Sequence, residues 1–140
     1  MRDRNRFQRR AQWLGWLGLL PFLGGTLLIL SGVKDAWVIE GLRNYAAIIL
    51  SFIGAIHWGR ALHMDHAGLA SFSIWPALYA WVCLFLPLSL GFPLLASGFL
   101  LLLLIDQQQY RATTTSWFRR LRIQLSLSVS GLLLLSWSVT

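Results

Sequence analysis

The sequence predicts an all-α polytopic membrane helix bundle of about five transmembrane helices, and its composition carries this prediction. Hydrophobic residues make up 56% of the 140 residues and charged residues only 12%, whereas about 25% of a soluble domain is charged. Eight tryptophans in so short a chain are typical of aromatic belts at membrane interfaces. The length allows one integral-membrane domain over residues 1–140 and no separate soluble domain.

The first predicted helix covers residues 11–33, AQWLGWLGLLPFLGGTLLILSGV. A helix crosses the hydrocarbon core with about 20 residues, so this stretch suffices. A cleaved signal peptide is the rival interpretation, because basic residues precede the stretch. The apolar part is too long and no clean cleavage site follows, so we expect a retained helix. Pro21 is expected to kink it, since proline removes a backbone donor.

Four further apolar stretches follow, each expected to form a membrane-embedded helix. The SLSVS segment alternates like a strand, but it lies within an apolar run long enough to span, which favours helix. The predicted ranges are 45–62, 71–86 (with Pro76 near its start), 93–108 and 121–139.

The connection between the third and fourth helices is expected to be a tight turn marked by Pro87, Gly91 and Pro93. Counted only to Ile105, the fourth helix is short, so it either thins the bilayer locally or continues through Asp106. A re-entrant hairpin of the third and fourth segments is an alternative.

The distribution of Lys and Arg predicts a cytoplasmic N-terminus and a C-terminus outside. In this orientation ten basic residues lie in the inner segments and two, Lys34 and Arg43, in the outer ones. The basic clusters adjoin long apolar stretches, which favours a topology signal over nucleic-acid binding. The inner basic residues are Arg2, Arg4, Arg6, Arg9, Arg10, Arg60, Arg111, Arg119, Arg120 and Arg122.

Polar residues from three separate segments are predicted to lie at one membrane depth near the cytoplasmic face. His57 is about one to one and a half turns from the end of the second helix, Asp106 ends the fourth, and arginines begin the fifth. Ionised side chains near hydrocarbon cost several kcal/mol unless paired or wetted, so contact between them is plausible. The predicted polar cluster comprises His57, Trp58, Asp106, Trp117, Arg119 and Arg122, with Arg111 as another partner for Asp106.

Three interpretations of this cluster stay open. The leading one is a structural clasp that locks the cytoplasmic ends of the helices. The second is a ligand, proton or ion site, and the third is unpaired snorkelling of the side chains to the interface.

Small residues on two helices predict close helix packing, because they let two backbones approach. Ala47, Ser51 and Gly54 share one face of the second helix, and Ser128 and Gly131 share one face of the fifth. We expect these two faces to meet.

Catalytic and metal-binding patterns are weak or missing. His63 and His66 flank Asp65, but two histidines are too few for a convincing metal site. The single cysteine, Cys83, excludes an intrachain disulfide. The sequence predicts no enzyme, no metal and no cofactor.

Several stretches resemble one protein family. They are YAAIILSFIGAIHWG at 45–59, LGLLPFLGG at 17–25, and an aspartate after the fourth helix followed by WFRRLR at 117–122. They are similar to a small family of uncharacterised bacterial membrane proteins, catalogued as a domain of unknown function, that includes the mitochondrial human transmembrane protein 69. The resemblance implies a multi-helix inner-membrane fold and no established activity. Many relatives are expected to carry a proline before that tryptophan, where this chain has TTTS at 113–116.

Three kinds of function are compatible with these features. The leading hypothesis is a non-enzymatic accessory or assembly module that packs, within the lipid bilayer, against another membrane protein or a second copy of itself. The alternatives are a small oligomeric carrier or proton-linked permease, or a lipid or quinone binder, using His57, Asp106 and Arg122. The expected location is the bacterial inner (cytoplasmic) membrane, because the short basic N-terminus contains Asp3 and makes a poor mitochondrial presequence.

Overall fold

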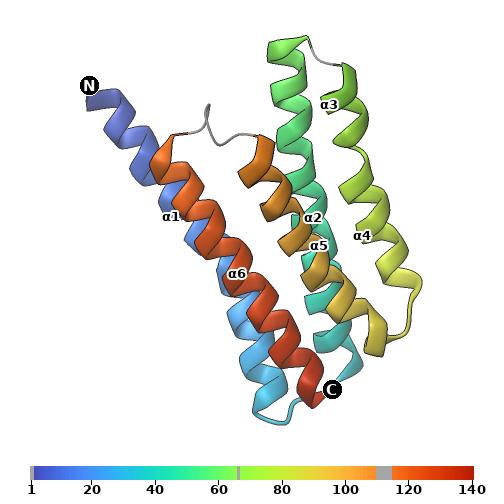
Figure 1. Cartoon of the computed structure of the whole chain (residues 1–140). Coiled ribbons are helices and arrows are strands. Elements are labelled where there is room, and N and C mark those ends of the chain that lie inside the picture. Colours follow the sequence, from blue (N-terminus) through green and yellow to red (C-terminus); the bar gives the residue numbers. More distant parts are fainter. Residues whose placement is uncertain (1, 66, 110–114) are drawn as a thin grey trace.

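The computed structural model describes residues 2–65, 67–109 and 115–140, and most of them are helical (Figure 1). Five segments are long and apolar enough to cross a membrane: α1, α2, α3 together with α4, α5, and α6. The predicted all-α fold with five spans is therefore confirmed. The helices are α1 (Arg2–Leu30), α2 (Ala36–Met64), α3 (Ala67–Phe72), α4 (Trp75–Phe85), α5 (Leu88–Gln109) and α6 (Ser116–Val139).

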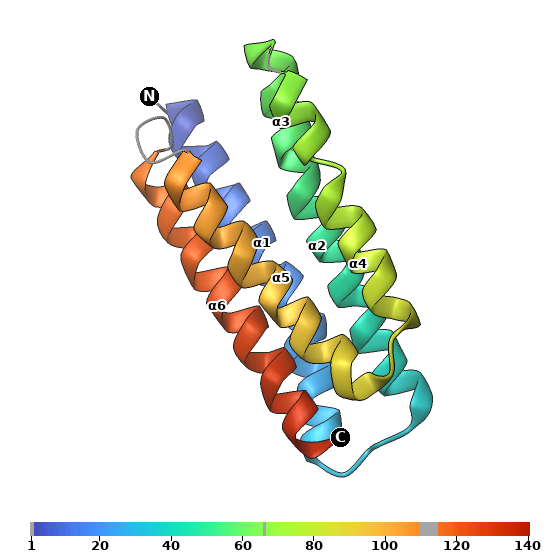
Figure 2. The ribbon, with the colours of Figure 1, turned by 45° about the vertical axis from the view of Figure 1, so that its right-hand side comes forward.

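Four of the helices form a ring in which α1 packs on α2, α2 on α5, α5 on α6, and α6 on α1. The segment α3–α4 lies outside this ring, with α4 against α2 and α5 (Figures 1 and 2). α1 and α6 begin at the same end of the bundle at which α2 and α5 finish. We call this the N-terminal end and the opposite one the C-terminal end.

The centre of the ring is filled by aromatic and aliphatic side chains. Phe22 of α1 and Phe99 of α5 are almost fully buried, and their rings meet edge to face with centroids 6.3 Å apart. Tyr45 of α2 packs on Phe22 at 5.0 Å and donates a 2.9 Å hydrogen bond to the Gly18 carbonyl. Such interhelical hydrogen bonds and close packing drive helix association in lipid, where apolar surface alone gives no preference for protein over hydrocarbon.

α2 is longer than predicted, because it begins at Ala36 and not near residue 45. The additional turns contain Glu40 and Arg43, which pair at 2.8 Å. Arg43 also donates to the carbonyls of Leu84 (2.9 Å) and Leu86 (2.7 Å) at the end of α4. The polar residues that suggested a loop therefore lie inside the helix. Glu40 pairs with Arg43, and both terminal nitrogens of Arg43 bind carbonyls, while its Nε is buried without a hydrogen-bond partner among the described residues.

α5 also begins earlier than predicted, at Leu88, and Pro93 lies inside it. The prediction of a turn extending from Pro87 to Pro93 was wrong. Proline at 93 leaves the Ser89 carbonyl without its helical donor, and the Trp137 indole nitrogen donates to that carbonyl at 2.9 Å. α5 continues past Asp106 to Gln109, as one of the two predicted alternatives required.

The first and third spans also differ from their predicted ranges. α1 starts in the basic N-terminal segment, continues through Pro21, and ends at Leu30, before Gly32, whose positive φ of 97° closes the helix. The third span starts at Ala67 and is interrupted between α3 and α4. Pro76 explains the interruption, because it has no N–H for the carbonyl four residues earlier.

The prediction that the small faces of α2 and α6 meet was wrong. α2 and α6 lie on opposite sides of the ring and, over the described residues, do not pack on each other. Gly54 instead approaches Pro76 of α4, and Gly131 has open space where a side chain would project. Ala47 is buried, Ser51 is half-buried, and Ser128 is half-buried on α6.

Candidate functional site

The site is centred on Asp106 of α5, whose carboxylate contacts one side chain from each of two other helices, a histidine of α2 and an arginine of α6. His57 Nε2 of α2 lies 3.0 Å from Oδ1 of Asp106. Arg122 of α6 donates from Nε to Oδ2 at 3.1 Å, and a terminal guanidinium nitrogen contacts the same oxygen. The side chains are 2% (His57), 11% (Arg122) and 17% (Asp106) exposed. This triad joins α2, α5 and α6.

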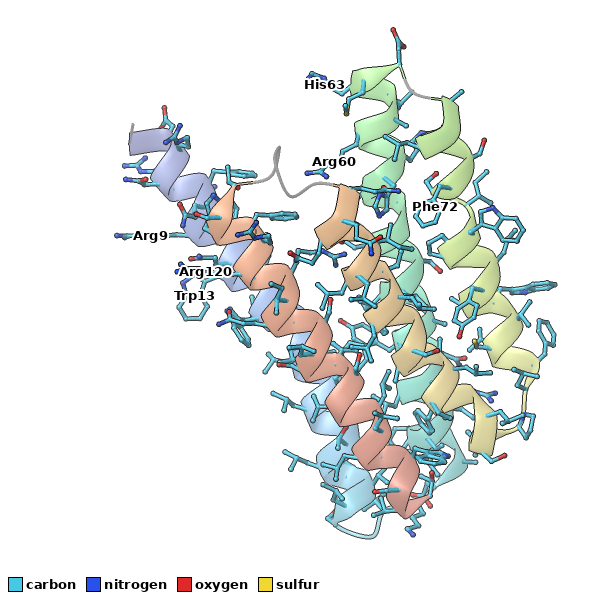
Figure 3. The ribbon with its side chains drawn as sticks, in the orientation of Figure 1. Arg9, Trp13, Arg60, His63, Phe72 and Arg120 are labelled. Atoms are coloured by element: carbon cyan, nitrogen blue, oxygen red, sulfur yellow. The ribbon has the colours of Figure 1, made fainter. Side chains whose placement is uncertain are left out.

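Local electrostatics explain why Asp106 needs these partners. It occupies the last turn of α5, where the helix dipole is negative and disfavours a carboxylate. Arg122 supplies a fork of N–H donors suited to a carboxylate. Phe72 of α3 meets the His57 imidazole edge to face at 5.4 Å and projects towards α2 (Figure 3). The ring of His57 is thereby held between an apolar neighbour and the carboxylate.

A small polar cavity adjoins the triad. Its volume is about 30 Å³. One water molecule needs roughly 10–15 Å³ of such volume, so the cavity accommodates about two waters. Its walls are Ile56, His57, Arg60, Asp106, Gln107, Phe118, Arg119 and Arg122.

Three residues of the predicted cluster lie outside the triad. Trp58 is 46% exposed on the outer side of α2. Trp117 stacks edge to face on Phe118 at 5.8 Å and lines a different cavity with Arg120. Arg119 is half-buried and lines the polar cavity, and it forms no salt bridge with any described residue.

Two other predictions involve residues that the structure does not describe. Arg111, the alternative partner for Asp106, lies outside the described residues, as does His66 beside Asp65. Within the described parts of the chain, no group of three His, Cys, Asp or Glu side chains is arranged to hold a metal ion.

Arg43 is a structural residue that the sequence analysis missed, because it was counted as a charge of an outer loop. It is 8% exposed and satisfies two carbonyls where α4 ends. The signal was present in the sequence. Pro87 terminates the preceding helix and leaves carbonyls without donors, and an arginine within an apolar run is suited to bind them.

A second feature that was not predicted is an apolar groove of about 380 Å³ beside the triad. It shares Ile56, Phe118 and Arg122 with the polar cavity, so the two spaces are contiguous. Its remaining walls come from α1 (Ala11, Leu14, Gly15, Gly18, Leu19, Phe22), α2 (Ile49, Phe52, Ile53), α5 (Phe99) and α6 (Leu121, Leu125, Ser126, Val129).

Five apolar spans joined by short connections define the chain as a multi-pass helical membrane protein. A family model described as "Protein of unknown function (DUF3429)" matches residues 7–138, and the chain belongs to this family. The family resemblance found in the sequence is thus confirmed.

The chain is also similar to transmembrane protein 69 of Xenopus tropicalis, with 36% identity over 81 residues. The matched part is 53% of this chain and 32% of that protein, so the chain spans about a third of the relative's length. No solved structure matches the chain.

Proposed function

We propose that the protein is a non-enzymatic accessory or assembly module that packs against other membrane proteins. The observation that carries this proposal is the closed triad. Asp106 is satisfied by His57 and Arg122 from two other helices, which is the arrangement expected of a clasp that fixes the N-terminal end of the bundle.

The lack of repeated halves supports a clasp over a carrier. The space directly around the triad, about 30 Å³, has room for about two water molecules, and the larger adjoining groove touches the triad only at Arg122. Transporters commonly bind substrate between repeated halves of the fold, and the sequence contains no such repeat. The structural interpretation of the triad therefore remains our first choice.

The exposure of the spans supports association with other membrane proteins. In the most apolar window of each span, the buried share ranges from 22% to 44%. Most residues of every span are therefore available to lipid or to a protein neighbour. Among the described residues, the connections between helices are short, so recognition by such a module would take place mainly within the membrane.

We propose a cytoplasmic N-terminus and location in a bacterial inner membrane. The support is the gathering of arginines at the N-terminal end of the bundle, which the positive-inside rule associates with the cytoplasmic face. Cysteine labelling tests this orientation, because the single native Cys83 is 1% exposed. We expect a membrane-impermeant maleimide to label Thr140→Cys in intact spheroplasts and Asn5→Cys only after permeabilisation.

The proposed role is tested by photo-crosslinking in native membranes, followed by native mass spectrometry in mild detergent. A photoreactive residue replaces either Leu20 on α1 or Val82 on α4, which are 56% and 49% exposed. A stoichiometric protein adduct from one face and not from the other supports a specific partner. Adducts to lipid alone at both positions would contradict the accessory role.

The carrier alternative is tested with His57→Ala in proteoliposomes. A clasp predicts lower thermal stability and no change in ion or proton flux relative to empty liposomes. Flux that depends on His57 while the thermal stability is preserved would favour a carrier.

A further inference from the structure

We propose that the apolar groove binds one acyl chain of an anionic phospholipid, with the lipid phosphate held at the polar end by Arg119 and Arg122. The inference goes beyond the accessory role and does not depend on it. It rests on the dimensions of the groove, its lining and the charge at its polar end.

The groove has the depth of one bilayer leaflet. Its lining on α1 runs from Ala11 to Phe22, and on α6 from Phe118 to Val129. Eleven residue steps of helix rise roughly 16 Å, about half of the 30 Å hydrocarbon core. The groove therefore extends from the N-terminal interface to the middle of the membrane.

The interior of the groove suits hydrocarbon. Phe22 and Phe99, which are 0% and 1% exposed, lie deepest among its lining residues. Among the lining residues of α1, Gly15 and Gly18 have no side chain, and over the whole lining only Arg122 and Ser126 carry polar side-chain groups. A volume of about 380 Å³ lies within the roughly 300–1,000 Å³ typical of small-molecule sites.

A single acyl chain is thin enough to enter the groove. Its walls include α1 and α2, which diverge towards the N-terminal end (Figures 1 and 2).

Charge at the polar end selects an anionic headgroup. The contiguous polar cavity is lined by Arg60, Arg119 and Arg122 and by one carboxylate, Asp106. Three positive charges against one negative charge leave a formal excess of +2 at the interface. Arg60 extends from α2 on the side of α6 (Figure 3). Basic pockets between transmembrane helices bind phosphate-bearing lipid headgroups, whereas a neutral quinone would leave this charge excess in place.

The test uses the full chain, delipidated in a neutral detergent, and native mass spectrometry with phosphatidylglycerol or phosphatidylcholine of identical acyl chains. Two variants address the two parts of the site. Arg119→Gln should weaken phosphatidylglycerol binding about fivefold, the contribution of one arginine near a membrane surface. Gly18→Leu adds a side chain at a residue that lines the groove, where the nearest heavy atom to the new Cβ would be the Tyr45 hydroxyl at 4.0 Å, and should weaken phosphatidylglycerol binding by at least about tenfold.

Each variant has a matched control. Arg120→Gln makes the same charge change next to Arg119, at a residue that lines neither space. Gly24→Leu makes the same substitution on α1 at an exposed position with nothing within 4 Å. Both controls should bind phosphatidylglycerol like the unmodified chain. A diazirine at the end of the acyl chain should cross-link to groove residues such as Leu125.

Equal binding of the two lipids would overturn the proposal, because charge would then play no part. So would equal effects of Gly18→Leu and Gly24→Leu, or cross-links confined to residues outside the groove. Recovery of a quinone or a protein segment cross-linked in the groove in place of the phospholipid would also refute it. Apart from a cross-linked protein segment, which would itself identify a partner, none of these results bears on whether the chain has a stoichiometric protein partner.

Discussion

Gly54→Ala should destabilise the bundle, because α2 and α4 approach closely at Gly54. A Cβ atom at residue 54 would lie 2.6 Å from Cβ and 2.8 Å from Cγ of Pro76. Non-bonded carbons are best separated by about 3.5–4.0 Å. The proline ring is rigid and cannot rotate away, so α4 has to retreat by about 1 Å.

The expected cost follows from two opposing effects. Overpacking of this kind typically costs 1–3 kcal/mol, here taken as about 2. Replacing glycine by alanine within a helix returns up to about 1 kcal/mol through backbone entropy. We therefore expect the free energy of unfolding to fall by about 1–2 kcal/mol. Gly54→Leu should change stability in the same direction and by more.

The assay is unfolding of the purified chain in mixed micelles titrated with a denaturing detergent, followed by circular dichroism and tryptophan fluorescence. Gly59→Ala is the matched control, because Gly59 is on the same helix and a Cβ atom there would meet nothing within 4 Å. It should leave stability unchanged or raise it slightly. Equal stability of the Gly54→Ala and Gly59→Ala variants would refute the proposed contact with α4.

Three further substitutions test the polar contacts. Asp106→Asn leaves the charge of Arg122 without its carboxylate and should lower the free energy of unfolding by about 1–3 kcal/mol in the same assay. This is less than for a fully buried pair, because the arginine side chain can extend towards water. Unchanged stability would contradict the clasp. Arg43→Ala removes two hydrogen bonds to carbonyls and should lower the free energy of unfolding by about 2–3 kcal/mol. Arg43→Lys should recover less than half of this loss, because lysine lacks the forked guanidinium group. Full recovery by lysine would refute the role given to the guanidinium geometry. Tyr45→Phe removes only the hydrogen bond to Gly18 and should cost about 0.5–1 kcal/mol, so a loss several times larger would show that the hydroxyl has another function.

The depth of the polar residues was predictable from the sequence, whereas their lateral neighbours were not. Helix lengths and alternating directions bring His57, Asp106 and Arg122 to one level, where the structure brings their side chains together. Depth depends only on counting residues along each helix. Which helices are neighbours depends on their packing. That is why Gly54 was assigned to a contact with α6 although its neighbour is Pro76 of α4.

Helix boundaries were predicted least well where a distant side chain satisfies a local backbone defect. Pro93 suggested a turn, but the Trp137 indole binds the carbonyl that this proline leaves without a donor. Arg43 suggested a loop, but its guanidinium binds carbonyls at the end of α4. In hydrocarbon an unsatisfied backbone group costs several kcal/mol, so such compensation decides where a helix begins. Donor and carbonyl are 41 or more positions apart in the sequence in each of these contacts, beyond the reach of local pattern analysis.

The position of the groove follows from how the two ends of the bundle are fastened. At the C-terminal end, Lys34 donates to the Val139 carbonyl, and the contacts of Arg43 and Trp137 tie α2 to α4 and α5 to α6. At the N-terminal end, the triad ties α2, α5 and α6 but includes no residue of α1. The hydrogen bond from Tyr45 to Gly18 joins α1 to α2 near the middle of both helices. From this hydrogen bond towards the N-terminal end, α1 diverges from α2 (Figure 1). The groove therefore lies beside α1, the one helix of the ring that contributes no residue to the triad.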